Sequence, residues 1–332
     1  MLPILKLPYL AQLEALKHLE VYEQFFLGLC STRAKLLVQT RRQDFDETVI
    51  DVRRYLVTVK NSGKKKRQEV VMWASTLFRP EHKYLVPKET DKDRKICFWY
   101  KGTRIRCGIS FHFSMRGIPI IWCKDKYKRL IPLALQDSIC DVFNLSRKIQ
   151  IAFKMSKVSE FPETDVVDNL SESASRFTYP GYSQFFKELQ IKNCAKIRLP
   201  EDDILDPDHR IFSTPHLHIH GKNKLSREHL LRFGGRSFTL SKCQSINMDG
   251  IIDFVKNWKS GGSENLEFLL ITLDRCGWFH NNKFWEDFEG KPWDADKRGG
   301  RFKNPETMET THQIDLLDCT QQLDIQRDSG GL

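Results

Sequence analysis

The chain has 332 residues, of which 40% are hydrophobic and 11% aromatic, so it has enough apolar material for a core and is not globally disordered. Its length fits one large domain or about two to three smaller ones, and its apolar runs fall short of the roughly eighteen residues of a transmembrane helix. The net charge of +10 is concentrated in residues 41–130, which hold 23 Lys and Arg against 10 Asp and Glu.

The opening residues lack the features of a secretory signal peptide. Lys6, Glu14 and Lys17 interrupt the apolar stretch, and no small-residue cleavage site follows it. We therefore expect an intracellular protein, cytoplasmic or nuclear, that has no membrane partner.

Three short helices are predicted in residues 1–42. In the first, over about residues 8–19, leucine recurs at positions 10, 13, 16 and 19. Because a step of three is shorter than the helical period of about 3.6, these leucines spread over a wide arc. Ser31 should be the N-cap of the third helix. The side chains expected to point inward from the later helices are Val21, Phe25, Phe26, Leu29, Ala34, Leu37 and Val38. So small a unit cannot bury all of its apolar surface, and the first helix should contact another domain or another protein.

Residues 43–131 are predicted to form a basic, β-rich segment. Several stretches rich in β-branched and aromatic residues alternate with turns, which predicts a small antiparallel sheet. The expected strands are residues 55–60, 69–75, 94–100, 104–114 and 118–124. The loop "NSGKKKRQ" (61–68) carries a dense positive run, Lys64, Lys65, Lys66 and Arg67.

Helix and strand patterns alternate over residues 132–275, which predicts an α/β fold there and an α+β or α/β class for the whole chain. The expected helices are 134–144, 183–190, 226–233 and 248–260; the expected strands are 147–155, 195–200, 216–221, 237–240 and 266–273; residues 156–180 are expected to be loop. Glycine pairs at 234–235 and 261–262 follow two of these helices at a leucine-rich-repeat spacing. We expect a short leucine-rich-repeat-like solenoid with a parallel sheet, then an irregular tail over 276–332.

A row of histidines, His216, His218 and His220, is the strongest candidate for a metal site. Alternate residues of a strand share a face, so two imidazoles could ligate zinc. No third ligand or supporting carboxylate accompanies them, and the alternative is a polar face that binds a partner. Nine widely spaced cysteines without a C-x-x-C pair likewise predict reduced thiols instead of disulfides or a zinc ribbon. We therefore predict no metal.

No catalytic motif is present in the sequence. The glycine pairs follow helices, which is the wrong side for a phosphate-binding loop, and no hydrolase, metalloprotease or kinase motif occurs. We predict that the chain is not an enzyme and has no catalytic residues and no cofactor.

The basic segment leaves two kinds of partner open. Trp73, Phe98, Trp99 and Tyr100 could stack on nucleic-acid bases, with the positive residues on phosphates. Positive charge equally suits an acidic protein surface. Because no named nucleic-acid motif occurs, nucleic-acid binding is the weaker hypothesis.

The opening stretch "LPYLAQLEALKHLEVYEQFFLGLCSTR" (7–33) resembles an F-box. The features that fall at F-box spacing are the Leu7-Pro8 pair, the leucines at 13, 16 and 19, the acidic Glu20 and Glu23, and the "LCSTR" ending.

The C-terminal half resembles an F-box-associated domain of the second type, as found in an expanded nematode family of F-box proteins. Its signature is a helix with a Lys-x-Trp element, then Gly, then a strand that opens on Leu-Glu. The matching residues are Phe254, Lys256, Trp258, Gly261, Gly262, Leu266 and Glu267. "GKPWDADKR" (290–298) resembles the tail of that family.

The resemblance implies a substrate receptor of an SCF-type cullin–RING ubiquitin ligase, which binds the ligase adaptor and through it a cullin, and holds a target protein. The docking positions it implies are Leu7, Pro8, Leu10, Leu13, Leu16, Leu29 and Cys30. For the target, we expect exposed strand faces that include His216, His218 and His220, and next the loop with Lys64, Lys65, Lys66 and Arg67. Leu10 replaces a common acidic residue and Gln24 a common apolar one, so a degenerate F-box that no longer joins a ligase stays an alternative.

Overall fold

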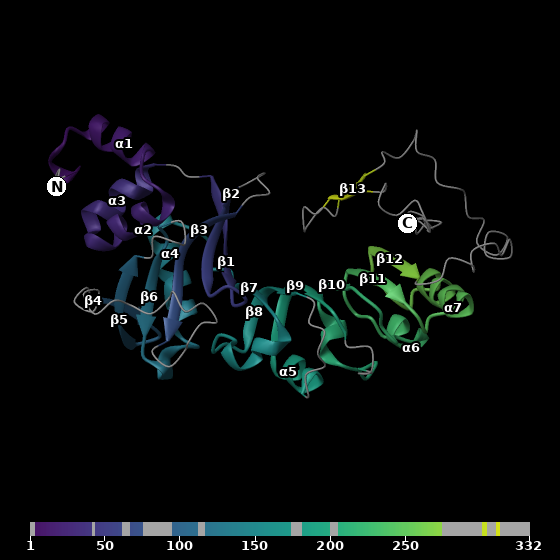
Figure 1. Cartoon of the computed structure of the whole chain (residues 1–332). Helices are drawn as coiled ribbons and strands as arrows, with labels where there is room; N and C mark the ends of the chain where they lie inside the picture. The colour runs from purple at the N-terminus through teal and green to yellow at the C-terminus, as the bar shows by residue number, and fades with distance from the viewer. Residues whose placement is uncertain are drawn as a thin grey trace. The chain divides into compact units, whose positions relative to one another are not determined.

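The computed structural model describes residues 4–41, 44–61, 67–75, 95–111, 117–173, 181–199, 205–273, 301–303 and 310–312. The chain divides into two compact units, residues 1–175 (unit 1) and residues 176–332 (unit 2), and each contains helices and strands (Figure 1). The domain boundaries expected at residues 42, 131 and 275 stay predictions.

Unit 1 begins with the three predicted helices. The helical elements of unit 1 are η1 (Ile4–Lys6), α1 (Tyr9–Lys17), α2 (Val21–Cys30), α3 (Thr32–Thr40), η4 (Asp125–Tyr127), α4 (Ile131–Phe143) and η5 (Met155–Glu160). Ser31 caps α3 as expected, because its hydroxyl accepts a hydrogen bond from the Ala34 N–H at 3.1 Å. The inward face of α2 differs from the prediction: Gln24 and Gly28 are buried, whereas Phe26 and Leu29 are half-buried.

Gln24 has a structural reason to be polar inside this helical unit. Its side-chain amide donates to the carbonyls of Leu19, at 2.8 Å, and Leu16, at 3.3 Å. These carbonyls lie at the C-terminal end of α1, where helix carbonyls have no partner within the helix. The glutamine therefore satisfies the end of α1 and fixes the turn into α2.

The sheet of unit 1 is mixed. Its strands, in chain order, are β1 (Phe45–Asp51), β2 (Leu56–Asn61), β3 (Arg67–Ser75), β4 (Lys95–Tyr100), β5 (Thr103–Phe111), β6 (Pro119–Cys123), β7 (Gln150–Phe153) and β8 (Val166–Glu172). Their order across the sheet is β8-β7-β1-β2-β3-β6-β5-β4. The five strands predicted in residues 55–124 are confirmed, but the expected purely antiparallel arrangement is wrong, because β3 and β6 run parallel.

Two strands of unit 1 were not predicted. β1 pairs with β7 in parallel, Ile50 opposite Ile151, so the β-rich segment and the residues after 131 share one sheet. β8 lies in residues 156–180, which we expected to be loop. Both strands mix carboxylates with apolar residues, and the buried side chains of β8 include Val167 and Leu170.

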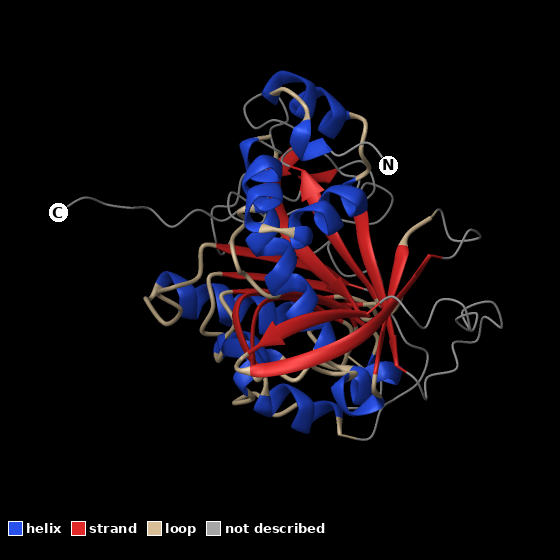
Figure 2. Cartoon of the chain, turned by 90° about the vertical axis from the view of Figure 1, so that its left-hand side faces the viewer, coloured by secondary structure: helices blue, strands red, loops and turns tan. Residues whose placement is uncertain are grey.

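Helix α4 joins the N-terminal helices to the sheet. It contacts β1, β2, β3 and β4 and also packs against α2 and α3, and Figure 2 shows helices layered on the strands. Lys35 of α3 makes an ion pair with Asp141 at 3.0 Å, and the Gln39 amide donates to the Asp141 carbonyl at 2.8 Å. The N-terminal helices thus pack directly on the rest of unit 1 through α4.

Gly28 is the point of closest approach between α2 and α4. A Cβ atom at this position would lie 2.6 Å from Cγ1 of Val142. We expect Gly28→Ala to lower the free energy of unfolding by about 1 kcal/mol, because overpacking outweighs the better helix propensity of alanine. Urea denaturation measures this loss. In the double variant with Val142→Ala the two losses should be less than additive, and full additivity would contradict the contact.

Unit 2 is built on a parallel sheet, as expected. The strands β9 (Gln190–Ile197), β10 (His216–Ile219), β11 (Ser237–Cys243) and β12 (Phe268–Leu273) are hydrogen-bonded in chain order. Helical elements precede or connect them: α5 (Tyr182–Glu188), η6 (Arg210–Ser213), α6 (Arg227–Leu231) and α7 (Met248–Lys259). Figure 1 shows α5, α6 and α7 along one side of these strands. In the expected irregular tail, the described residues form an antiparallel pair, β13 (Arg301–Lys303) and β14 (Thr310–His312).

Candidate functional site

Exposed apolar side chains concentrate on the N-terminal helices. Among the described residues, four large hydrophobic side chains are exposed: Tyr9 by 55%, Leu10 by 78%, Leu36 by 56% and Trp99 by 62%. Three of these belong to α1 and α3, which contact each other. Beneath them, Leu16, Phe25 and Ala34 are fully buried. The helical unit therefore has its own core and still leaves apolar surface to solvent.

The expected docking residues divide into three groups. Pro8, Leu10 and Cys30 are exposed, and Leu7, Leu13 and Leu29 are half-buried. Leu16 is buried completely and belongs to the core of the helices, so the structure corrects its expected place at the surface.

Tyr9 and Leu36 are exposed apolar residues that the sequence analysis did not single out. Leu36 could have been found, because it is the apolar residue of the third helix that lies outside the predicted inward set.

The histidine row lies where the sequence predicted, on and just after β10. His216 and His218 share a face of the strand, but His216 is 2% exposed and its Nδ1 lies 2.8 Å from the Ser237 hydroxyl. The expectation of three exposed histidines is therefore corrected at His216. Burial, and then the charges of Lys196 and Arg198, lower the pKa of His220. Within the described residues, no group of three or more His, Cys, Asp or Glu side chains is placed to hold a metal ion.

The expected basic and aromatic residues do not all face solvent. Lys64, Lys65 and Lys66 lie outside the described residues, and Arg67 is exposed at the start of β3. Trp73 and Phe98 are 4% and 2% exposed, which corrects the expectation that their rings could stack on a ligand. Tyr100 is half-buried. Of these four aromatic rings, only that of Trp99 is widely exposed.

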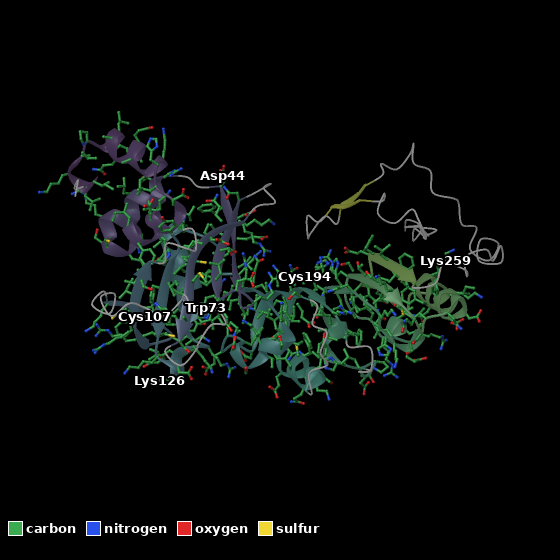
Figure 3. All side chains as sticks on the ribbon, in the orientation of Figure 1. Asp44, Trp73, Cys107, Lys126, Cys194 and Lys259 are labelled. Atoms are coloured by element: carbon green, nitrogen blue, oxygen red, sulfur yellow. The ribbon has the colours of Figure 1, made fainter. Side chains whose placement is uncertain are left out.

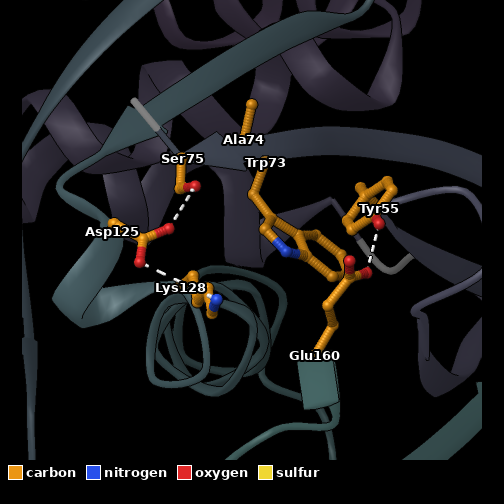
Figure 4. Close-up of a pocket in the computed structure, with 7 residues that line it drawn as sticks. All are labelled: Tyr55, Trp73, Ala74, Ser75, Asp125, Lys128 and Glu160. Carbon is orange, nitrogen blue, oxygen red and sulfur yellow. Dashed lines mark hydrogen bonds and ion pairs between the residues drawn. The ribbon is translucent and has the colours of Figure 1, made fainter. Parts of the chain in front are cut away.

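A pocket of about 240 Å³ opens in unit 1 (Figure 4). It is lined by Tyr55, Trp73, Ala74, Ser75, Asp125, Lys128 and Glu160. Its polar side chains pair with one another. The Tyr55 hydroxyl donates to Glu160, the Ser75 hydroxyl donates to Asp125 at 2.9 Å, and Lys128 lies 3.7 Å from the same carboxylate.

The lining of this pocket contains two carboxylates, Asp125 and Glu160, one ammonium group, Lys128, and the ring of Trp73 (Figure 4). Each carboxylate already has a protein partner. In the described part of the chain, the buried side-chain nitrogen and oxygen atoms that lack a hydrogen bond all belong to residues outside the pocket. The hydroxyl of Ser75 has the Asp125 carboxylate as its neighbour, and that carboxylate also has Lys128 beside it.

The cysteines of β4, β5 and β6 differ sharply in environment. Cys97 is exposed, whereas Cys107 (labelled in Figure 3) and Cys123 are buried. Burial raises the pKa of both buried thiols to about 12. At pH 8 we expect about one in ten thousand of each to be thiolate, the reactive form.

Alkylation with iodoacetamide at pH 8, followed by peptide mass spectrometry, should therefore label Cys97 well before Cys107 and Cys123. In denaturant the three rates should become similar. Equal rates in the folded protein would contradict the burial of the inner face of the sheet.

Comparisons of the chain with protein-family models, with curated proteins and with solved structures find no match. No helix in the described residues combines the length and the apolar character needed to cross a membrane.

Proposed function

We propose that this chain is the non-catalytic substrate receptor of an SCF-type cullin–RING ubiquitin ligase. The N-terminal helices bind the adaptor subunit, and the remainder of the chain holds a target protein close to the ubiquitin-charged enzyme. The proposal combines the F-box resemblance of residues 7–33 with the exposed apolar surface of the same helices.

The observation that carries the proposal is the exposure of Tyr9, Leu10 and Leu36 around a complete internal core. These three side chains lie on two contacting helices, so they offer a candidate apolar surface for a partner. Burial of one leucine side chain against a partner is worth about 1.5–3 kcal/mol. Several such side chains supply the apolar centre that a stable protein interface requires.

The packing of unit 1 also suits a receptor. The N-terminal helices contact α4, and α4 contacts four strands of the sheet. The close approach of Gly28 to Val142 leaves little room for one helix to slide on the other. A receptor acts by fixing the position of its target relative to a reaction carried out by partners, and rigid packing serves that purpose.

We further propose that unit 2 is the leucine-rich-repeat-like solenoid implied by the resemblance. Its four strands are parallel and adjacent in chain order, as in stacked strand–helix repeats. Asn223 is fully buried, and its side chain donates to the carbonyls of Gly221, just after β10, and of Ser241 in β11, at 3.0 and 3.2 Å. Such a bridge between adjacent repeats supports a stacked architecture.

Co-purification of the full chain with the purified adaptor subunit tests the proposal. A stable complex on size-exclusion chromatography is the expected result. Absence of a complex would refute ligase assembly and favour the degenerate F-box alternative.

A further inference from the structure

The hairpin formed by β4 and β5 carries only positive charge. Residues 95–111 contain no Asp or Glu and four cations, Lys95, Lys101, Arg104 and Arg106, all of which are exposed. In the described structure none of the four is paired with a carboxylate. Some other cations of unit 1 do make such pairs, Lys35 with Asp141 and Arg54 with Glu69. Uncompensated charge of this density favours an anionic partner.

The pairing of the two strands places the arginines beside an aromatic ring. Trp99 lies opposite Arg104, and Cys97 lies opposite Arg106. Alternate residues of a strand share a face, so these four side chains lie on the same side of the hairpin. The other side is buried and includes Phe98 and Ile105 in the core. Arg104 and Arg106 are two residues apart and thus separated by about 7 Å along the strand.

The ring of Trp99 is available to a ligand. The side chain is 62% exposed, and the Arg104 guanidinium lies 6.0 Å from the ring centroid, at the outer limit of a cation–π contact. On the next strand, Trp122 lies on the same face, opposite Gly108, and is half-buried. Gly108 of β5 lies between Lys95 of β4 and Trp122 of β6 in the sheet. Because glycine has no side chain, no β5 side chain separates Lys95 from Trp122 at this position.

We propose that this basic face, defined as Lys95, Trp99, Arg104 and Arg106 together with Lys101 of the turn between the two strands, binds single-stranded nucleic acid. The cations contact successive phosphates, and a base stacks on the indole ring. Stacking on a ring accepts any base, so binding is largely independent of sequence. This function is separate from ligase assembly, because it uses β4 and β5 and none of the N-terminal helices.

An acidic protein segment fits the basic face less well. The centre of a protein interface is apolar and poor in lysine, whereas on this face Trp99 is the one large exposed apolar side chain and two of the four cations are lysines. An acidic peptide would neutralise the cations and leave no specific use for an open indole ring.

Fluorescence anisotropy of the full chain with labelled oligouridine and oligothymidine of about 12 nucleotides tests the proposal. We expect binding that weakens with salt, with a slope of log K against log [salt] near −3 for about four phosphate contacts. Stronger binding of oligouridine would indicate contacts to the 2′-hydroxyl, and equal binding would indicate recognition of chemistry common to RNA and DNA.

Two variants separate charge from stacking. Arg104→Gln with Arg106→Gln should weaken binding at least tenfold and reduce the size of the salt slope by about 1.4. Trp99→Ala should weaken binding about tenfold without changing the slope, and Trp99→Phe should restore most of the loss. All three side chains are exposed, so the variants should keep the circular dichroism spectrum of the wild type.

The matched control is Lys187→Gln with Arg210→Gln, which removes two exposed cations of unit 2. This variant should bind like the wild type. The proposal fails if neither oligonucleotide binds at low salt, or if the control loses as much affinity as the double arginine variant. It also fails if polyglutamate displaces the oligonucleotide equally well per charge, which would indicate an acidic protein partner.

Discussion

Replacing Leu10 by aspartate should abolish binding of the ligase adaptor while the protein stays folded. Leu10 is 78% exposed, so the free protein loses little packing. In the proposed complex the same change removes about 1.5–3 kcal/mol of apolar burial, and it leaves a carboxylate without a partner in a desolvated interface. Together these costs predict a loss of affinity on the order of 100-fold or more, measurable by biolayer interferometry with the purified adaptor.

Trp99→Asp is the matched control, because it also replaces a large exposed apolar side chain of unit 1 by a carboxylate. It should bind the adaptor like the wild type. If Leu10→Asp binds normally, the apolar surface of α1 is not the docking site. Leu16 cannot serve in this test, because a charge at a fully buried position would unfold the helices and remove binding for a trivial reason.

The division between core and docking surface could not be predicted from the spacing of the leucines. A step of three distributes leucines around the helix, and the sequence does not indicate which part of that arc the rest of the chain covers. The structure places Leu16 inside and Leu10 outside, and Gln24 and the Arg41 guanidinium donate to the Leu16 carbonyl. These donors lie 8 and 25 residues further along the chain, outside the leucine pattern of α1.

The strands were predictable where apolar residues alternate or run continuously, as in β3 and β12. β1 and β8 were not predicted because carboxylates interrupt their apolar pattern. β1 pairs with the next strand, β2, and also with β7 much further along the chain, and β8 pairs with β7. The alternation of side chains along a strand likewise shows that Trp99 and Phe98 lie on opposite faces of β4. It does not show which face α4 covers, and this decides which ring can meet a ligand.

The largest loss of stability is expected for Asp51→Ala. Asp51 ends β1 and is 1% exposed. Its carboxylate accepts two hydrogen bonds from the Arg53 guanidinium, at 2.8 and 2.7 Å, and one from Arg54 at 3.1 Å. Removal of one partner of a buried ion pair leaves the other without compensation. Arg53 is partly exposed, so we expect a loss near the lower limit of such cases, about 3 kcal/mol of unfolding free energy in urea titrations.

The same carboxylate predicts how stability depends on pH. Burial raises the pKa of Asp51, but the hydrogen bonds and charges of Arg53 and Arg54 outweigh it, so the pKa lies below its usual value. A carboxyl whose folded pKa is lowered stabilises the protein above its unfolded pKa, about 3.9, and loses this contribution as pH falls through the folded value. The wild type should therefore lose more stability below about pH 4 than Asp51→Asn does.

Asp46→Ala provides the control for both measurements, because Asp46 is an exposed carboxylate on the same strand. The free energy of unfolding of this variant should stay within about 0.5 kcal/mol of the wild type, and it should fall with decreasing pH in the same way as that of the wild type. Asp51→Asn keeps the shape of the side chain but not its charge, so it should fall between the wild type and Asp51→Ala. If Asp51→Asn were as stable as the wild type at pH 7, the arginine pairs would contribute nothing net, and the turn between β1 and β2 would be held by backbone geometry alone.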